Sequence, residues 1–132
     1  MLTIRRQAEI VSDPSLSARF GIDGLAITRL ISGDTTGATA LVVDRVEFEP
    51  DVRHALHRHP AAEQVIYVLD GSGLCLREGD DLPMGAGDAV YIPAGSWHGF
   101  FNNSAGRTVI LNITGGVSMP EQGGYEEASI TA

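Results

Sequence analysis

Three of the four histidines in this chain lie in two short stretches that could hold a metal ion. His57 and His59 begin the stretch HRHPAAEQVIYVLDG, and His98 lies in the stretch GDAVYIPAGSWHGFFN. The first stretch also contains Glu63 and Gln64, whose side-chain oxygens are further potential ligands. Imidazole suits zinc, copper, iron and nickel, and oxygen donors add manganese. These residues predict one divalent ion per chain, with zinc, manganese, iron and nickel as candidates.

The first stretch reads as two short strands joined by a turn. Residues i and i+2 of a strand point to the same face, so His57 and His59 can offer two imidazoles to one side. Pro60 then interrupts the strand, because proline fixes φ and cannot donate to a ladder. A new strand is expected from Glu63, and Asp70-Gly71 is a tight hairpin signal at its end.

The second stretch has a similar organisation. Residues 89–92 form a short apolar segment, and Pro93-Ala94-Gly95 predicts a turn. His98 is expected on the strand that follows, with Phe100 on the same face. Phe100 is therefore predicted to line a pocket beside His98, since binding pockets usually have apolar walls.

The second stretch resembles the second conserved motif of the cupin superfamily. That motif is glycine, five residues, proline, one residue, glycine, two residues, histidine, three residues and asparagine. Every fixed position matches, and the matching residues are Gly87, Pro93, Gly95, His98 and Asn102. The resemblance implies an all-β fold, the double-sheet jelly-roll β-barrel, with residues 1–132 as a single domain. The two motifs cover residues 51–102, between an N-terminal lead (1–23) and a C-terminal tail (115–132).

The first cupin motif matches with two departures. It is glycine, five residues, His-x-His, three or four residues, glutamate, six residues and glycine. His57, His59 and Gly71 fit, but Asp51 replaces the leading glycine and Gln64 replaces the glutamate. The resemblance implies that the metal ligands are His57, His59, His98 and the residue at the glutamate position.

The third ligand position has two candidates, Gln64 and Glu63. Periodicity does not choose between them, because the following strand is apolar on both faces. The motif spacing favours Gln64, and so does a similarity to a group of cupins with His-x-His, four residues, Gln and a later Tyr-Val-Leu. In that group, which includes a cupin acting on unsaturated uronates, the glutamine oxygen binds the metal. Three imidazoles and an amide leave the ion its full charge, which favours Lewis-acid chemistry.

Composition restricts the class of partner. The 132 residues are 43% apolar and 20% charged, as in a single globular domain, and the formal net charge is −8. An acidic chain is unsuited to nucleic acid and to anionic membrane surfaces, so we expect neither as a partner. Without a signal peptide or a long apolar run, we expect a cytoplasmic protein. The resemblance also implies a homodimer formed through the sheets.

Other residues carry weaker expectations. Asp44 interrupts an apolar strand and either lies at the barrel mouth, where it could contact substrate, or forms a rim salt bridge. His54 is expected on the surface, and Cys75 is expected to be buried and inert. Residues 1–12 could form an edge strand, and the tail 115–132 is expected to be partly ordered.

The sequence supports three hypotheses for function. The first is a metalloenzyme that acts on a small organic molecule, sugar-acid-like or bearing a carbonyl or enol, by isomerase, cyclase or lyase chemistry. Its general acid or base would be Glu63 or Asp44. The second is a metal-dependent dioxygenase, and the third is a protein that binds a small molecule without turnover.

Overall fold

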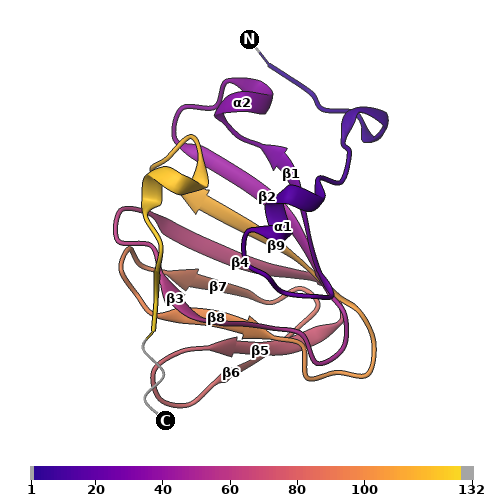
Figure 1. The fold of residues 1–132 in the computed structure, drawn as a ribbon, viewed down its shortest axis with the longest axis vertical. Coiled ribbons are helices and arrows are strands. Elements are labelled where there is room, and N and C mark those ends of the chain that lie inside the picture. Colours follow the sequence, from indigo (N-terminus) through magenta and orange to yellow (C-terminus); the bar gives the residue numbers. More distant parts are fainter. Residues whose placement is uncertain (1, 129–132) are drawn as a thin grey trace.

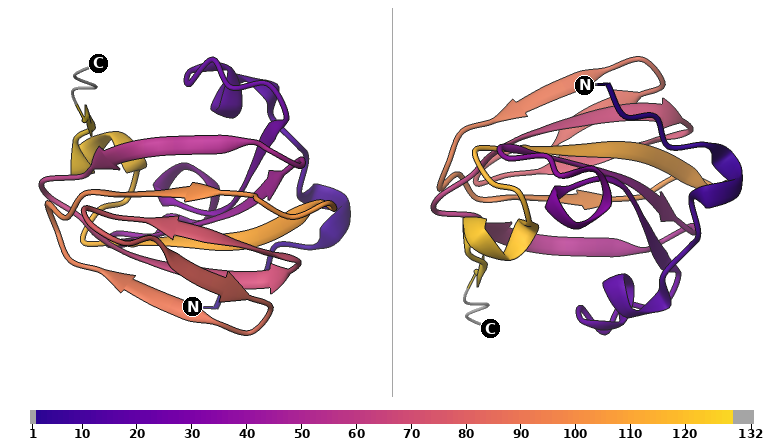
Figure 2. Two further views of the ribbon diagram at one scale, coloured as in Figure 1. Left: turned by 90° about the horizontal axis from the view of Figure 1, so that it is seen from below. Right: turned by 90° about the horizontal axis from the view of Figure 1, so that it is seen from above.

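The many short strands, separated by glycine and proline turns, form two antiparallel sheets in a computed structural model that describes residues 2–128 (Figure 1). The first sheet has the strand order β1 (Leu25–Ile31), β2 (Leu41–Phe48), β9 (Thr108–Gly115), β4 (Glu63–Asp70) and β7 (Ala89–Ile92). The second sheet has the order β10 (Glu126–Glu127), β3 (Arg53–Arg58), β8 (His98–Phe101), β5 (Ser72–Leu76) and β6 (Leu82–Gly85). The sheets form two layers, which confirms the all-β jelly-roll prediction (Figure 2).

Side chains alternate between the two faces of each long strand, as the period of two requires. In β2, Val42, Val46 and Phe48 are buried while Leu41 is exposed. Most inward apolar side chains of both sheets make one core, in which the ring centroids of Phe48 and Phe100 lie 5.0 Å apart. A second, smaller cluster consists of Val42, Ala62 and Val117.

Two turn positions of the first motif, Gly71 and Asp51, have a backbone with positive φ. Gly71 has φ of +84°, and a Cβ atom there would lie 2.7 Å from the Thr108 hydroxyl oxygen, so the turn requires glycine. Asp51 has φ of +67°, in the left-handed region that aspartate tolerates better than most residues. The chain therefore keeps a glycine-like backbone at position 51 without a glycine.

The asparagine of the second motif has a structural role. Asn102 is fully buried, and its amide nitrogen donates to the carbonyl oxygens of Phe48 (3.0 Å) and Gly106 (2.8 Å). Its amide oxygen accepts from the backbone N–H of Ser104 at 3.0 Å and from the Ser104 hydroxyl at 2.7 Å. These bonds join the end of β2 to the turn after β8.

Both terminal segments pack against the sheets. Helix α1 (Pro14–Ala18) begins at Asp13, whose carboxylate accepts from the Ser15 N–H at 3.0 Å, and it packs on β1. After β9 the chain forms the 3-10 helix η2 (Pro120–Gly123) and then pairs with β3 as β10, in yellow in Figure 1. The tail is thus ordered as far as residue 128, and the rest lies outside the described residues.

The N-terminal lead differs from the edge strand that the sequence suggested. Residues 2–12 contain the 3-10 helix η1 (Gln7–Glu9) and no strand. The Arg5 side chain, rather than a backbone ladder, donates to the carbonyl oxygens of Arg29 (3.0 Å) and Leu30 (2.9 Å) on edge strand β1. A second short helix, α2 (Gly33–Thr36), follows β1. Within the described residues, no helix has the length and apolar character needed to cross a membrane.

The outer face of the first sheet carries exposed large apolar side chains on three of its strands. Leu41 of β2, Tyr67 and Leu69 of β4, and Tyr91 of β7 are between 37% and 60% exposed. An apolar patch of this kind on a sheet commonly marks an interface. It is the surface on which we expect a second copy of the chain to pack.

Replacing Asn102 by leucine should lower the free energy of unfolding by about 3 kcal/mol, because it leaves two carbonyl groups and two donors without their partner. Asn103→Leu, at the exposed neighbouring position, is the matched control and should change stability little. Urea denaturation of the three proteins measures the difference, and equal midpoints would contradict the structural role of Asn102.

The double variant Tyr67→Glu, Tyr91→Glu should be monomeric, since it places charges in the apolar outer face of the first sheet. Sedimentation velocity at several concentrations measures the mass of the variant and of the wild type. Ala105→Glu, in an exposed turn, serves as a control that should leave the wild-type mass unchanged. A wild type that stays monomeric at all concentrations would rule out the dimer.

Candidate metal centre

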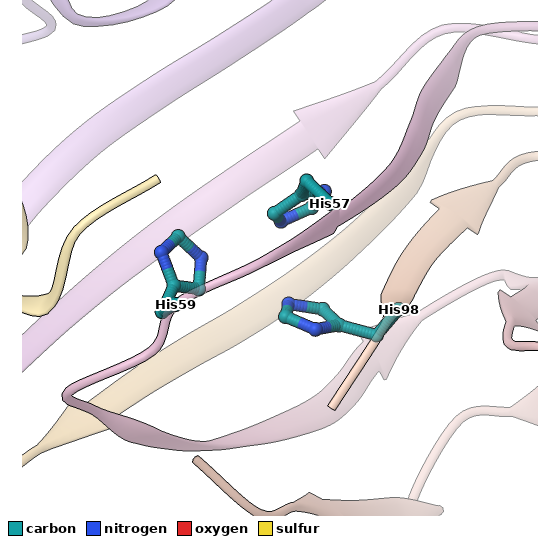
Figure 3. Close-up of side chains that lie close together, drawn as sticks. All are labelled: His57, His59 and His98. Carbon is teal, nitrogen blue, oxygen red and sulfur yellow. The ribbon is translucent and has the colours of Figure 1, made fainter. Parts of the chain in front are cut away.

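Two neighbouring strands bring three histidines together inside the barrel. His57 of β3 lies directly opposite His98 of β8, and His59 follows the end of β3. The ring centroids lie 4.3 Å (His57 and His98), 5.1 Å (His57 and His59) and 5.4 Å (His59 and His98) apart. Figure 3 shows the three rings turned toward a common point. Their potential ligand nitrogens all lie within 4.8 Å of one another.

This spacing suits a single ion. Two ligand nitrogens at about 2.1 Å from a tetrahedral zinc ion lie about 3.4 Å apart. A pair at the 4.8 Å limit would need to close by about 1.4 Å, or about 0.7 Å for each ring, to share one ion.

Backbone carbonyl groups fix the protonation of each ring. The Nδ1 atoms of His57, His59 and His98 lie 2.8, 2.8 and 2.9 Å from the carbonyl oxygens of Ala55, Gly124 and Ser96. Because a carbonyl oxygen can only accept, each Nδ1 carries the proton and donates it. The Nε2 atom of each neutral ring is then the free lone pair that a metal ion requires.

The electrostatics of the cluster also keep the rings neutral. Burial lowers the pKa of His98 to about 4 and holds the pKa of His57 well below its usual range. Burial lowers the pKa of His59 as well, against the opposing effect of its bond to Gly124. Neutral imidazoles can bind a cation at pH 7 without first losing a proton.

The structure places Gln64 and Glu63, the two candidates for the third ligand position of the motif, on opposite faces of β4. Gln64 is buried in the wall of the same cavity, and its amide nitrogen donates to the Thr114 hydroxyl at 3.0 Å. The Gln64 amide oxygen is buried without a hydrogen-bond partner. Glu63 instead lies exposed on the opposite face of β4, where its carboxylate accepts from the Tyr91 hydroxyl at 3.4 Å. A buried acceptor without a partner is costly, and a metal ion beside the histidines would satisfy it.

The other two predicted site residues also line this cavity, which has a volume of about 250 Å³. Phe100 is buried in its wall beside His98. Asp44 is buried and paired with Arg29, whose Nε atom lies 2.5 Å from the carboxylate. Burial raises the pKa of Asp44, and the Arg29 guanidinium opposes that shift. Asp44 thus forms a salt bridge, as one of the two expectations had it, but inside the cavity rather than on the rim.

A comparison with models of protein families identifies the family of this chain. A family model described as "Cupin domain" matches residues 44–114, more than half of the chain. The chain belongs to the cupin family.

Known proteins resemble this cupin in sequence and in fold. An "Oxalate-binding protein" of Thermotoga maritima is 27% identical over 97 residues, which are 74% of this chain and 80% of the relative. The polyketide cyclase RemF from Streptomyces resistomycificus superposes with a TM-score of 0.76 at 23% identity, covering 99% of this chain and 88% of RemF. KdgF from Halomonas sp. superposes with a TM-score of 0.72 at 16% identity, covering 88% of this chain and 94% of KdgF. At these identities the two solved structures show the shared fold.

Two residues of the cupin cavity were not expected from the sequence. His54 was placed on the surface, but it lines the cavity and stacks on His57 with 4.1 Å between the ring centroids. A register shift in β3 between His54 and His57 gives that strand one residue more than β8, which brings both side chains to the same face. Tyr125, from the tail, lies 5.2 Å from His57, and its hydroxyl lies 3.2 Å from Nε2 of His54. The position of His54, three residues before the His-x-His pair, was the one sequence feature that could have indicated its place in the cavity. No sequence pattern indicated that Tyr125 would lie there.

The free energy of unfolding of the metal-free cupin should fall as the pH is lowered below about 6.5. The folded state holds the histidine pKa values low, so only the unfolded chain takes up these protons between pH 6.5 and about 4. Above pH 6.5 both states are neutral and the contribution to stability is complete.

Urea denaturation in the presence of a chelator, at a series of pH values, measures this fall. His98→Gln should show a shallower slope by up to about 1.4 kcal/mol per pH unit, since it removes one linked proton. A wild-type stability that is flat from pH 7 to 5 would contradict the neutral cluster.

Proposed function

We propose that this cupin holds one divalent metal ion on His57, His59, His98 and Gln64 and acts on a small organic molecule by isomerase, cyclase or lyase chemistry. The observation that carries the proposal is the Gln64 amide oxygen, buried without a partner in the cavity that the three histidines line. The free Nε2 atoms of the three rings complete a set of four neutral ligands.

The neutral ligand set favours this kind of chemistry. When bound, a divalent ion there supplies a Lewis acid that keeps its full charge and stabilises negative charge on a substrate oxygen. A glutamate at position 64 would lower the charge of the site by one, whereas glutamine is neutral. Its amide nitrogen donates to the Thr114 hydroxyl at 3.0 Å, and its amide oxygen remains available to an ion.

Residues of the cavity wall supply the remaining functions. Asp44 faces the cavity and is therefore a better candidate than the exposed Glu63 for proton transfer. Burial raises its pKa, which makes the carboxylate a stronger base than it would be in water. Phe100 and Tyr125 contribute aromatic rings to the cavity wall, and the ring of Tyr125 stacks on His57 with 5.2 Å between centroids.

Two other functions use the same site. Binding of a small molecule without turnover is favoured by the likeness to the oxalate-binding protein of Thermotoga maritima. Metal-dependent oxidation is favoured by the fold shared with oxalate oxidase, at a TM-score of 0.65 and 22% identity, although this chain covers only 55% of that protein. Oxygen uptake by the iron- or manganese-loaded protein would indicate metal-dependent oxidation. Ligand binding without formation of a product would indicate a binding protein.

The metal content of protein purified without a histidine tag tests the proposal directly. We expect a nearly stoichiometric ion in the wild type, measured by inductively coupled plasma mass spectrometry, and its loss in His98→Ala. Gln64→Leu should weaken metal binding more than about tenfold, because it removes a ligand. Glu63→Leu, on the other face of the same strand, is the matched control and should keep the ion.

The identity of the ion directs the choice of assay. Zinc leads to screens for isomerase, cyclase and lyase activity, while iron or nickel leads first to oxygen consumption. A wild type that holds no ion and takes up none on dialysis would refute the metal site and leave a metal-free binding protein.

A further inference from the structure

A row of polar side chains crosses the inner face of the first sheet, next to the row that holds Gln64. Arg29 of β1 lies opposite Asp44 of β2, and Asp44 lies opposite Asn112 of β9, so the three are neighbours across adjacent strands. All three line the same cavity as the histidines. Gln64 pairs with Thr114, which lies two residues from Asn112 on the same face of β9. The polar row therefore lies about 7 Å along the strands from the Gln64 row.

This polar row retains hydrogen-bonding capacity after its internal bonds are counted. Arg29 directs Nε and Nη2 at the two carboxylate oxygens of Asp44, at 2.5 and 3.3 Å. A guanidinium has five N–H groups, so donors remain on Arg29. The Asn112 amide oxygen is buried without a hydrogen-bond partner. Such a group is normally satisfied in a folded protein, and here a bound molecule can satisfy it.

Beyond the polar row, on the side away from Gln64, the cavity wall is apolar. This part of the wall includes Leu16 of helix α1 and Phe20 after it, Ile27 and Val46 from the first two strands, and Ile110 from β9, while Ile66 of β4 lies beside Asn112. Arg19 and Glu121, which also line the cavity, pair with each other at 3.2 Å. A polyhydroxylated molecule such as a free sugar would place hydroxyl groups against the apolar side chains, where they would lose their bonds to water. The cavity thus suits a molecule with an apolar body.

Charge defines what the polar row can bind. Arg29 and Asp44 neutralise each other, and Asn112 adds an amide that can both donate and accept. A carboxylate placed there would meet the charge of Asp44, whereas a hydroxyl group can accept from Arg29 and donate to Asn112. The row therefore suits a neutral group that both accepts and donates a hydrogen bond.

We propose that the cavity binds a ring compound with an apolar body, which places one oxygen function at the metal centre and an uncharged hydroxyl group at Arg29, Asp44 and Asn112. This substrate class, a phenol or enol rather than a sugar acid, rests on the proposed function for its metal-bound end. The hydroxyl end rests on the polar row alone.

Three matched probes test the row on the metal-loaded protein by isothermal titration calorimetry. They are 2,3-dihydroxynaphthalene, whose paired hydroxyls can chelate the ion, and its derivatives with a third hydroxyl or with a carboxylate at position 6. The third hydroxyl should tighten binding about tenfold, the size of one well-made hydrogen bond. The carboxylate should weaken it.

Asn112→Leu is the informative variant, because it keeps the branching and the number of heavy atoms of the side chain and does not touch the bonds between Arg29 and Asp44. It should abolish the tenfold preference while the affinity for 2,3-dihydroxynaphthalene stays within about twofold. Asn103→Leu, the exposed control, should keep the preference. Any of four results would overturn the inference. Two concern the wild type: equal affinity for 2,3-dihydroxynaphthalene and its trihydroxy derivative, or tightest binding of the carboxylate derivative. The others are a preference for the third hydroxyl that survives in Asn112→Leu, and the failure of all three probes to bind.

The same titrations after metal removal separate this inference from the proposed function. Chelation should lower the affinity of all three probes and keep their ratio, because the polar row does not contact the ion. Affinities that do not fall on chelation would count against the metal role alone. A lost ratio with an intact response to metal would count against the hydroxyl subsite alone.

Discussion

The bond from each histidine Nδ1 to a backbone carbonyl oxygen is the interaction on which the metal centre depends. It fixes the tautomer and the direction of the ring together, and it leaves Nε2 free in a buried place where the charged ring is disfavoured. Each carbonyl belongs to a different part of the fold: the irregular strand β3, the turn before β8, and the tail at Gly124. The centre is therefore complete only when the barrel has closed and the tail has paired with β3.

Polar groups inside the barrel divide into satisfied and unsatisfied ones, and this division separates structural residues from candidate binding residues. Asn102 uses both amide atoms within the protein, and it joins a strand end to a turn. Gln64 and Asn112 each keep an amide oxygen that is buried without a partner. Both line the cavity, so a bound ion and a bound molecule are the groups that can satisfy them.

The sequence predicts the barrel and the approximate place of the site because both depend on local patterns. Turns at Asp70-Gly71 and Pro93-Ala94-Gly95 set the strands, and the motif spacing brings His57, His59 and His98 together. Periodicity could not choose between Gln64 and Glu63, because β4 is apolar on both faces and only packing reveals which face is inside.

The cavity residues that the sequence did not predict depend on an irregular strand or on contacts between distant parts of the chain. His54 joins the cluster through an extra residue in β3, which reverses the alternation that a regular strand would impose. Tyr125 lies about seventy positions along the chain from His54, so no local pattern connects them. Tail residues that read as a glycine-rich, acidic extension become part of the cavity wall through tertiary contacts.

The region that matches the family model and the region that shapes the cavity overlap only in part. All four candidate ligands lie within residues 44–114, but Leu16, Phe20, Arg29 and Tyr125 come from outside it. Insertions, deletions or exchanges in the two terminal segments can thus reshape the chamber while the ligand-bearing strands stay unchanged. Descent from a common barrel would then preserve the capacity to bind metal and let the choice of substrate diverge, so that relatives are best grouped by their termini.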